Sequence, residues 1–343
     1  MANRNIQLDI IRCIALFLII LCHTQIGLEN VSPGIVKLKW FVGKCGVPLF
    51  FIISGYLNLP MKYGDMEFIS KRFKRVFIPF LFWCIIYRVL SAIFENGALI
   101  RPNSEDLFLI ATSAHLWYIY AILALYMITP IISEYFHKCS QKMFQFYLIV
   151  WLASTTFTYY YHLTGHTFFD HNITYITYYI GGYLGYYILG YYIKRFNPIW
   201  IFGNWNLKNC LILGSIFLIG IIFIYAGYFH LNMTTVEISS YVTIVPVLFS
   251  ILAFSILWKI RVTNDYIMKV INSLSKYSFG IYLIHEAVIY YIFPLFFRDV
   301  CGLELNGIVV LLINLLVVSL NIVISYFIVR LVNLLPKSKF IFG

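Results

Sequence analysis

The chain has 343 residues, of which 61% are hydrophobic and only 11% charged, and its mean hydropathy is +0.83. These values exclude a water-soluble fold, which would need far more charged residues on its surface. A net charge of +11 would suggest a nucleic-acid partner in a soluble protein. In a chain this apolar, what matters first is which loops carry the Lys and Arg residues. The composition therefore predicts an integral membrane protein with no nucleic-acid partner.

Windows of about 20 apolar residues predict an all-α, polytopic membrane protein with about ten transmembrane helices. Most Lys and Arg residues then lie on the same side as the first residue, so the positive-inside rule places both termini in the cytoplasm. No long hydrophilic segment interrupts the spans, and we expect residues 1–343 to form a single membrane domain without an appended soluble domain. The expected spans lie near residues 7–27, 40–60, 76–96, 115–133, 143–162, 174–193, 209–229, 240–259, 277–297 and 305–335.

The first span carries three polar residues, Asp9, Arg12 and His23, in the run DIIRCIALFLIILCHTQ. Arg12 and His23 are eleven positions apart, about 1,100° on an ideal helix, so they share one face with a rise of about 16 Å. Asp9 lies one turn from Arg12 and is expected to pair with it, which lowers the cost of a charge in lipid. The spacing alone also allows a purely structural interpretation, with the pair at the inner interface and His23 at the outer one.

The second and third spans add a small-residue motif and a basic motif. In GVPLFFIISGYL, residues 46–57, Ser54 and Gly55 favour close helix approach over a nucleophilic role, because no charged base stands beside Ser54 in its span. In SKRFKRVFIPF, residues 70–80, Arg72 and Arg75 are three apart and share a helical face, a geometry suited to phosphate. An ordinary cytoplasmic anchor is the alternative for this basic run.

The fourth and sixth spans are rich in aromatic residues. HLWYIYAILALY, residues 115–126, begins with His115 and Trp117, which fit either an interfacial aromatic belt or a site. The segment at 174–192 is dominated by Tyr and Gly, which predicts close helix packing, with a wet, hydroxyl-lined cavity as the alternative. Its tyrosines and Trp117 are candidates for a platform on which a sugar ring stacks.

The ninth span contains an ionisable pair, His285 and Glu286, in YSFGIYLIHEAV, residues 277–288. At about mid-membrane depth such a pair is a hypothesis of function, with an inert core role as the alternative. The seven cysteines are scattered without a CxxC pair, so we interpret them as small apolar side chains. We expect no metal.

These motifs together resemble the acyltransferase-3 family of bacterial membrane acyltransferases, over essentially the whole chain. The residues that carry the resemblance are Arg12 and His23, separated by ten residues, the Gly-Val, Phe-Phe and Ser-Gly of 46–57, RFKR at 72–75, HLWYI at 115–119 and SFGIYLIH at 278–285. The likeness is strongest to stand-alone O-acetyltransferases of bacterial surface polysaccharides, of the enterobacterial common antigen type. It implies a multi-pass protein of the bacterial cytoplasmic (inner) membrane.

The resemblance implies that the chain moves an acyl group, usually acetyl from acetyl-CoA, to a sugar hydroxyl beyond the membrane. His23 would be the general base or a transient acyl acceptor, and Arg12 would orient the donor or stabilise developing negative charge. Arg72 and Arg75 would bind the donor's phosphates. Further candidates, which would line the substrate site or tunnel, are His115, Trp117, Tyr282, His285, Glu286 and Asp9.

Two other classes of function remain open at this stage. A transporter would use the buried charges as a proton relay, but it would usually show internal repeats and paired broken helices, and the two halves of this chain do not match. An inactive relative that only flips or exports a glycan is the second. Within the acyltransferase hypothesis, succinyl is the main rival to acetyl. The expected partners are a glycan or lipid-linked saccharide acceptor and membrane lipid.

Overall fold

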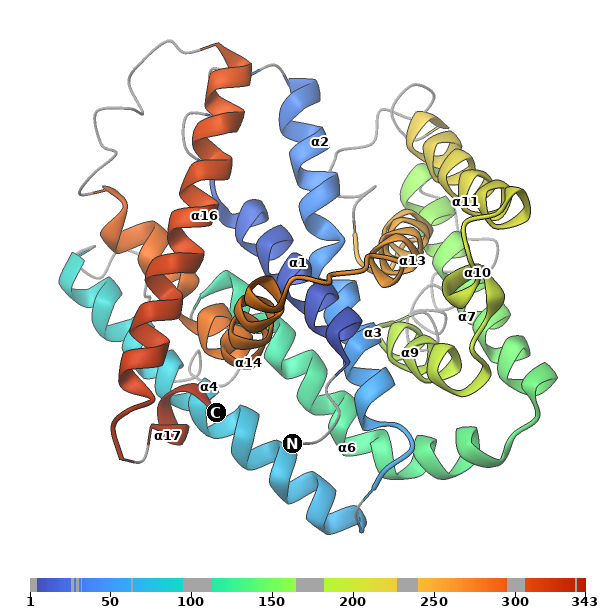
Figure 1. Cartoon of the computed structure of the whole chain (residues 1–343), viewed down its shortest axis with the longest axis horizontal. Coiled ribbons are helices and arrows are strands. Elements are labelled where there is room, and N and C mark those ends of the chain that lie inside the picture. The colour runs from blue at the N-terminus through green and yellow to red at the C-terminus, as the bar shows by residue number, and fades with distance from the viewer. Residues whose placement is uncertain are drawn as a thin grey trace. The chain divides into compact units, whose positions relative to one another are not determined.

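The computed structural model describes residues 5–25, 28, 31, 33–62, 64–94, 113–164, 182–226, 240–294, 306–336 and 338–343. Every regular element in these ranges is a helix and none is a strand, which confirms the all-α prediction. The elements, labelled in Figure 1 where there is room, are α1 (Ile6–His23), α2 (Pro33–Lys44), α3 (Gly46–Asn58), α4 (Asp65–Phe94), η2 (Ala114–Leu116), α6 (Trp117–Lys138), α7 (Gln141–Thr164), α9 (Leu184–Phe196), α10 (Ile199–Phe202), α11 (Leu207–Tyr225), α13 (Ile244–Trp258), α14 (Asp265–Ala287), η4 (Val288–Ile292), α16 (Gly307–Val332) and α17 (Lys339–Phe342).

Six stretches of the described helices are long and apolar enough to cross a membrane. The expected count of about ten therefore stays a prediction, as does the location of the termini. Among the expected spans outside the six, the one at 240–259 contains α13, which has only 15 residues. The one at 277–297 contains only the end of α14, which already begins at Asp265 with a polar first half. The six spans are Ile6–His23, Lys39–Asn58, Asp65–Phe94, Trp117–Lys138, Leu207–Tyr225 and Gly307–Val332.

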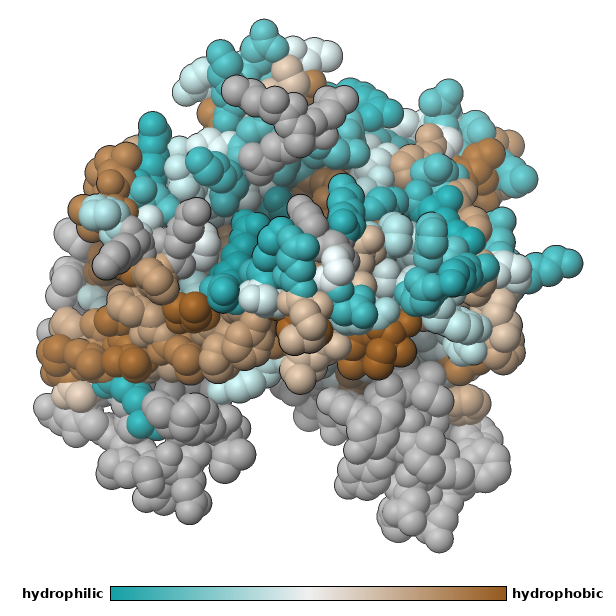
Figure 2. All heavy atoms as spheres, turned by 90° about the horizontal axis from the view of Figure 1, so that it is seen from below, coloured by the Kyte–Doolittle hydropathy of each residue, from teal (hydrophilic) through white to brown (hydrophobic). Residues whose placement is uncertain are grey.

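Exposed apolar side chains support the membrane assignment. Leu211 of α11 is 61% exposed and Leu312 of α16 is 59% exposed, positions that would be unfavourable in water and are ordinary against lipid. On the face drawn in Figure 2, hydrophilic residues gather in one area beside a band of hydrophobic ones. Such a separation is what a protein needs when part of its surface contacts lipid and part contacts water.

Asparagine side chains start four of the described helices, and before α14 Asn264 accepts hydrogen bonds from the backbone N–H groups of Tyr266 and Ile267. Asn5 accepts a hydrogen bond from the backbone N–H of the second helical residue of α1, and Asn206 and Asn306 accept equivalent bonds in α11 and α16. Each bond satisfies one of the N–H groups that a helix leaves unpaired at its first turn. The helix starts are therefore encoded locally, by the residue just before each apolar run.

The chain divides into two compact units, and α1 runs from the first into the second. The first unit consists of residues 1–19, 37–62 and 131–272. Within it α3 and α9 lie side by side, as Figure 1 shows, and touch backbone to backbone. A Cβ added to Gly55 would lie 1.7 Å from the Tyr187 carbonyl oxygen, and one added to Gly190 would lie 1.9 Å from that of Ile52. Both glycines are required by this close approach, as predicted for the two small-residue segments.

The second unit consists of residues 20–36, 63–130 and 273–343 and contains the end of α1, α4, the start of α6, the end of α14, α16 and α17. The indole of Trp83 in α4 donates a hydrogen bond to the carbonyl of Ile341, at 2.9 Å, and its ring lies 5.7 Å from that of Phe342. The short helix α17 is thereby held against α4. The ionisable residues of the ninth expected span belong to this unit, at the end of α14.

Candidate active site

Glu286 and His285 lie at the end of α14, one and two residues before its last residue. Glu286 is 1% exposed and His285 is fully buried. A carboxylate in an apolar interior is strongly unfavourable unless hydrogen-bond donors surround it. The local structure therefore depends on which donors reach Glu286.

Two histidines from distant parts of the chain reach the carboxylate. His23, the last residue of α1, places its Nδ1 2.8 Å from Glu286 Oε1, and His115, in η2, places its Nδ1 2.8 Å from Oε2. The hydroxyl of Ser113 donates a further hydrogen bond to Oε2. Oε1 thus faces one donor and Oε2 faces two, and we call His23, His115, His285 and Glu286 the histidine cluster.

The two histidines differ in their access to solvent or substrate. The side chain of His23 is 25% exposed, whereas that of His115 is 1% exposed. A proton on Nδ1 of His23 would face the carboxylate, 2.8 Å away, and would leave the lone pair of the ring on Nε2. A carboxylate that fixes the tautomer of an accessible imidazole is the arrangement found in hydrolytic and transfer enzymes that use histidine as a base.

His285 completes the histidine cluster. Its ring centroid lies 5.3 Å from that of His23 and 4.7 Å from that of His115, in edge-to-face contact with both. Its Nδ1 lies 2.6 Å from the carbonyl oxygen of Tyr282, while its Nε2 is buried without a hydrogen-bond partner among the described residues. The hydroxyl of Tyr282 donates a hydrogen bond to the carbonyl of His115, which ties α14 to the segment before α6.

Side chains of two other helices hydrogen-bond to the backbone of α14 where it carries these residues. The hydroxyl of Tyr87, on α4, donates to the carbonyl of Leu283 at 2.8 Å and accepts from the N–H of Ala287 at 3.2 Å, so it bridges the helical rung between them. The side chain of Asn321, on α16, donates to the carbonyl of His285 at 2.9 Å. Directly after Ala287 the chain forms a π-helical turn, η4, a feature that is frequent at functional sites.

The polar residues of the first span form the predicted ion pair. Arg12 Nη1 lies 3.5 Å from Asp9 Oδ1, with Asp9 buried and the Arg12 side chain 21% exposed. Both belong to the first unit, whereas His23 belongs to the second, and α1 is continuous between them. The structure therefore places Arg12 on the same helix as His23, with Asp9 as an ion-pair partner.

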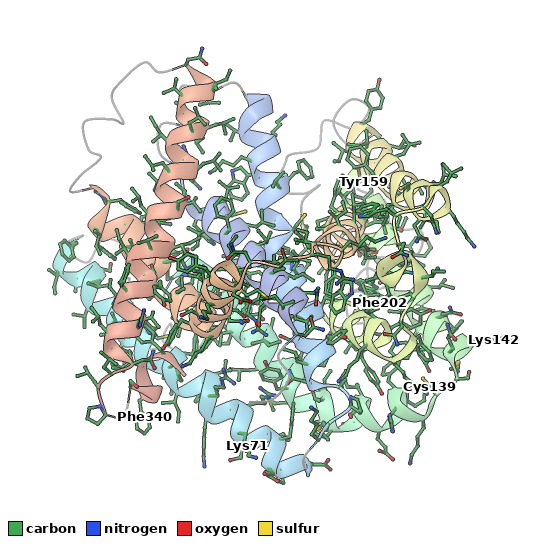
Figure 3. All side chains as sticks on the ribbon, in the orientation of Figure 1. Lys71, Cys139, Lys142, Tyr159, Phe202 and Phe340 are labelled. Atoms are coloured by element: carbon green, nitrogen blue, oxygen red, sulfur yellow. The ribbon has the colours of Figure 1, made fainter. Side chains whose placement is uncertain are left out.

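Arg72 and Arg75 lie in the first half of α4, within the helix rather than before it. The guanidinium of Arg72 lies over the rings of Phe68 and Tyr126, at 5.5 and 6.0 Å from their centroids, and Arg75 is exposed. Lys71 projects from the same half of α4, as Figure 3 shows, and pairs with Glu67. A guanidinium held by aromatic rings is already oriented, so it loses less freedom when it binds an anion.

Trp117 is half-buried in the first turn of α6, where its ring contacts that of Tyr118. Its expected role in a sugar platform stays a prediction. Residues 174–181 of the Tyr and Gly-rich segment lie outside the described residues, and in the described part Tyr186, Tyr187 and Tyr191 are buried. Sequence reasoning missed Ser113, Tyr87 and Asn321. Of these, Asn321 alone carried a signal, because it is a polar residue in the middle of a long apolar run.

The chain has helices that can span a membrane, and a buried carboxylate lies beside an accessible histidine. These features define a class: a membrane protein with a site for acid–base or nucleophilic chemistry. The sequence profile of the acyltransferase-3 family, described as an acyltransferase domain, matches residues 5–330. The chain belongs to this family and is a membrane acyltransferase. Comparison with curated proteins and with solved structures gives no match.

Proposed function

We propose that the protein is an O-acyltransferase that moves an acetyl group from cytoplasmic acetyl-CoA to a hydroxyl of a surface or lipid-linked glycan at the outer face. The observation that carries the proposal is the contact between His23 and Glu286, at 2.8 Å, in a chain of the acyltransferase-3 family. His23 is the accessible imidazole, and Glu286 fixes its tautomer.

In direct transfer, Nε2 of His23 takes the proton of the acceptor hydroxyl as the oxygen attacks the thioester carbonyl. The C–S bond breaks, and the departing thiolate receives that proton from the imidazolium. Glu286 stabilises the imidazolium while it exists, because its carboxylate stays ionised beside Nδ1. A route through a transient acyl-histidine uses the same residues, with Nε2 attacking the thioester first.

The basic half of α4 suits the phosphate-bearing end of the donor. Arg72 is oriented by two rings and Arg75 is exposed, so together they can make charge-assisted bonds to phosphate oxygens. Arg75 and Tyr87 both belong to α4, and the helix rises about 18 Å between them. A pantetheine arm on the order of 15 to 20 Å would cover this length. Since the ring of Tyr87 lies 5.4 Å from that of His115, α4 joins the proposed donor end to the histidine cluster.

The remaining parts of the proposal concern orientation and acceptor. We assign the protein to the bacterial cytoplasmic membrane, with about ten spans and both termini inside, because its basic residues follow the positive-inside rule. Arg12, held by Asp9, orients the donor or stabilises the oxyanion. Trp117 stacks against the acceptor sugar. A surface polysaccharide of the enterobacterial common antigen type is the acceptor class we favour.

The test is transfer of labelled acetyl from acetyl-CoA by membranes that contain the protein, with mass spectrometry of the surface glycans of cells with and without it. We expect His23→Ala and Arg12→Ala each to abolish transfer at unchanged membrane abundance. His137→Ala is the matched control, because His137 is exposed and its ring nitrogen contacts Tyr191 instead of the histidine cluster. Normal acylation by a correctly inserted His23→Ala protein would refute the mechanism. A mass shift of one succinyl unit would show that the transferred group is succinyl and not acetyl.

A further inference from the structure

The histidine cluster has the composition of a site for a transition-metal ion. One ligand atom each from His23, His285 and Glu286 lies within 4.8 Å of the other two, and both His285 and Glu286 are buried. Imidazole nitrogen and carboxylate oxygen are ligands that Zn²⁺ prefers, and two histidines with one glutamate form a known set of three protein ligands. This set was not predictable from the sequence, because the residues are not spaced as a metal motif.

A second observation points to a ligand at the same place. Nε2 of His285 and Nε2 of His115 are both buried without a hydrogen-bond partner among the described residues. An unpaired polar atom in an apolar interior is unfavourable, by about 1 to 3 kcal/mol on mutational scales. A bound cation would satisfy the lone pair on one of these nitrogens and would be partly neutralised by the carboxylate.

We infer that the histidine cluster is an inhibitory site at which His23, His285 and Glu286 bind Zn²⁺, an inference that rests on the proposed function. Tetrahedral zinc places its ligand atoms about 3.3 Å apart, so the three side chains must draw together by as much as about 1.5 Å. Rotation about the side-chain bonds of His23 supplies part of this movement, because that residue is a quarter exposed. Water or the acceptor hydroxyl takes the fourth position.

Inhibition follows from the chemistry of imidazole. A neutral imidazole has one proton and one lone pair on its two nitrogens, so a metal on either nitrogen leaves the proton on the other. His23 then has no lone pair with which to accept a proton or attack a thioester. The metal also occupies Glu286, which can no longer stabilise an imidazolium. Zinc therefore blocks acyl transfer while leaving the donor's basic site on α4 untouched.

The first experiment measures binding on the purified full chain in detergent, with Co²⁺ alone as the spectroscopic probe and Zn²⁺ as its competitor. We expect the visible absorption of tetrahedral Co²⁺, displaced by Zn²⁺ and greatly weakened in His285→Gln. His137→Gln is the matched control and keeps the signal. The chain has eight histidines, so the loss in His285→Gln, and not the total metal bound, decides the matter. An equal signal in His285→Gln and wild type overturns the site.

The second experiment measures acyl transfer against the concentration of Zn²⁺ in each variant, relative to the same variant in EDTA. We expect reversible inhibition of the wild type and at least about a tenfold higher inhibitory concentration in His285→Gln, since even loss of an outer partner weakens metal sites about 10- to 100-fold. Mg²⁺, which prefers oxygen ligands, should not inhibit.

The two proposals fail separately. Transfer that persists at saturating Zn²⁺, or equal sensitivity in His285→Gln and wild type, overturns the metal site and leaves the acyltransferase mechanism standing. If the wild type transfers no acyl group in EDTA, the proposed function fails and inhibition with it, while the Co²⁺ spectra still judge the metal site by itself.

Discussion

Replacing Glu286 with glutamine tests the mechanism at its centre, since the change keeps size and shape but removes the charge and one acceptor. Oε2 accepts a hydrogen bond from Ser113 and lies 2.8 Å from Nδ1 of His115, whereas Oε1 faces His23. The single oxygen of the amide should therefore take the position of Oε2, and its NH₂ group should face Nδ1 of His23.

An NH₂ group beside Nδ1 reverses the tautomer of His23. Nδ1 must then accept, so the proton moves to Nε2 and the base is lost. In catalytic triads the corresponding aspartate-to-asparagine change lowers kcat about 10⁴-fold, which is about 5.5 kcal/mol of barrier at 1.36 kcal/mol per factor of ten. We expect a fall of this order in Glu286→Gln.

The assay is transfer of labelled acetyl from acetyl-CoA, measured over a range of donor concentrations in membranes with equal amounts of protein. We expect kcat to fall and KM for the donor to change little, because the basic face of α4 is not altered. Glu134→Gln is the matched control, since Glu134 is exposed on α6 and pairs with Lys138. A kcat within tenfold of wild type in Glu286→Gln would refute the assignment of Glu286.

Three further predictions follow from single contacts. Tyr87→Phe removes a hydroxyl that hydrogen-bonds to two backbone groups of α14, the carbonyl of Leu283 and the N–H of Ala287. The loss of two buried hydrogen bonds should lower stability by about 1 to 3 kcal/mol, and kcat more than KM, measured by melting in detergent and by donor kinetics. Arg72→Ala with Arg75→Ala should raise KM for acetyl-CoA at least tenfold with a smaller effect on kcat, and unchanged KM would remove the phosphate role. Gly55→Ala should destabilise by about 1 to 3 kcal/mol or more, because its Cβ meets a backbone carbonyl, while Gly214→Ala, with open space around it, should not; equal melting temperatures would contradict the packing argument.

Features local to one helix were predictable from the sequence. The pairing of Asp9 with Arg12 follows from a spacing of three on a helix, and the tight packing at Gly55 follows from a small residue in an apolar span. The all-helical class follows from composition. In each case the cause lies within about a turn or a span, so no knowledge of the tertiary fold is needed.

The histidine cluster was only partly predictable, because its members come from segments far apart in the chain. His23, His115 and Glu286 each stood out singly as ionisable residues in apolar runs, but nothing in their spacing indicates that one carboxylate serves both imidazoles. Tyr87 could not be distinguished among 28 tyrosines, since its role depends on backbone groups of α14 that lie two hundred positions later. Tertiary contacts of this kind leave no local pattern.

Exposure, and not contact with Glu286, distinguishes the histidine that can be the base. Both imidazoles are 2.8 Å from the carboxylate, so orientation alone does not separate them. His115 is 1% exposed, and its backbone carbonyl is fixed by Tyr282, whereas His23 is 25% exposed at the end of α1. A base must reach the proton that it takes, so we propose that His115 is a second donor that holds Glu286 in place and that His23 is the base.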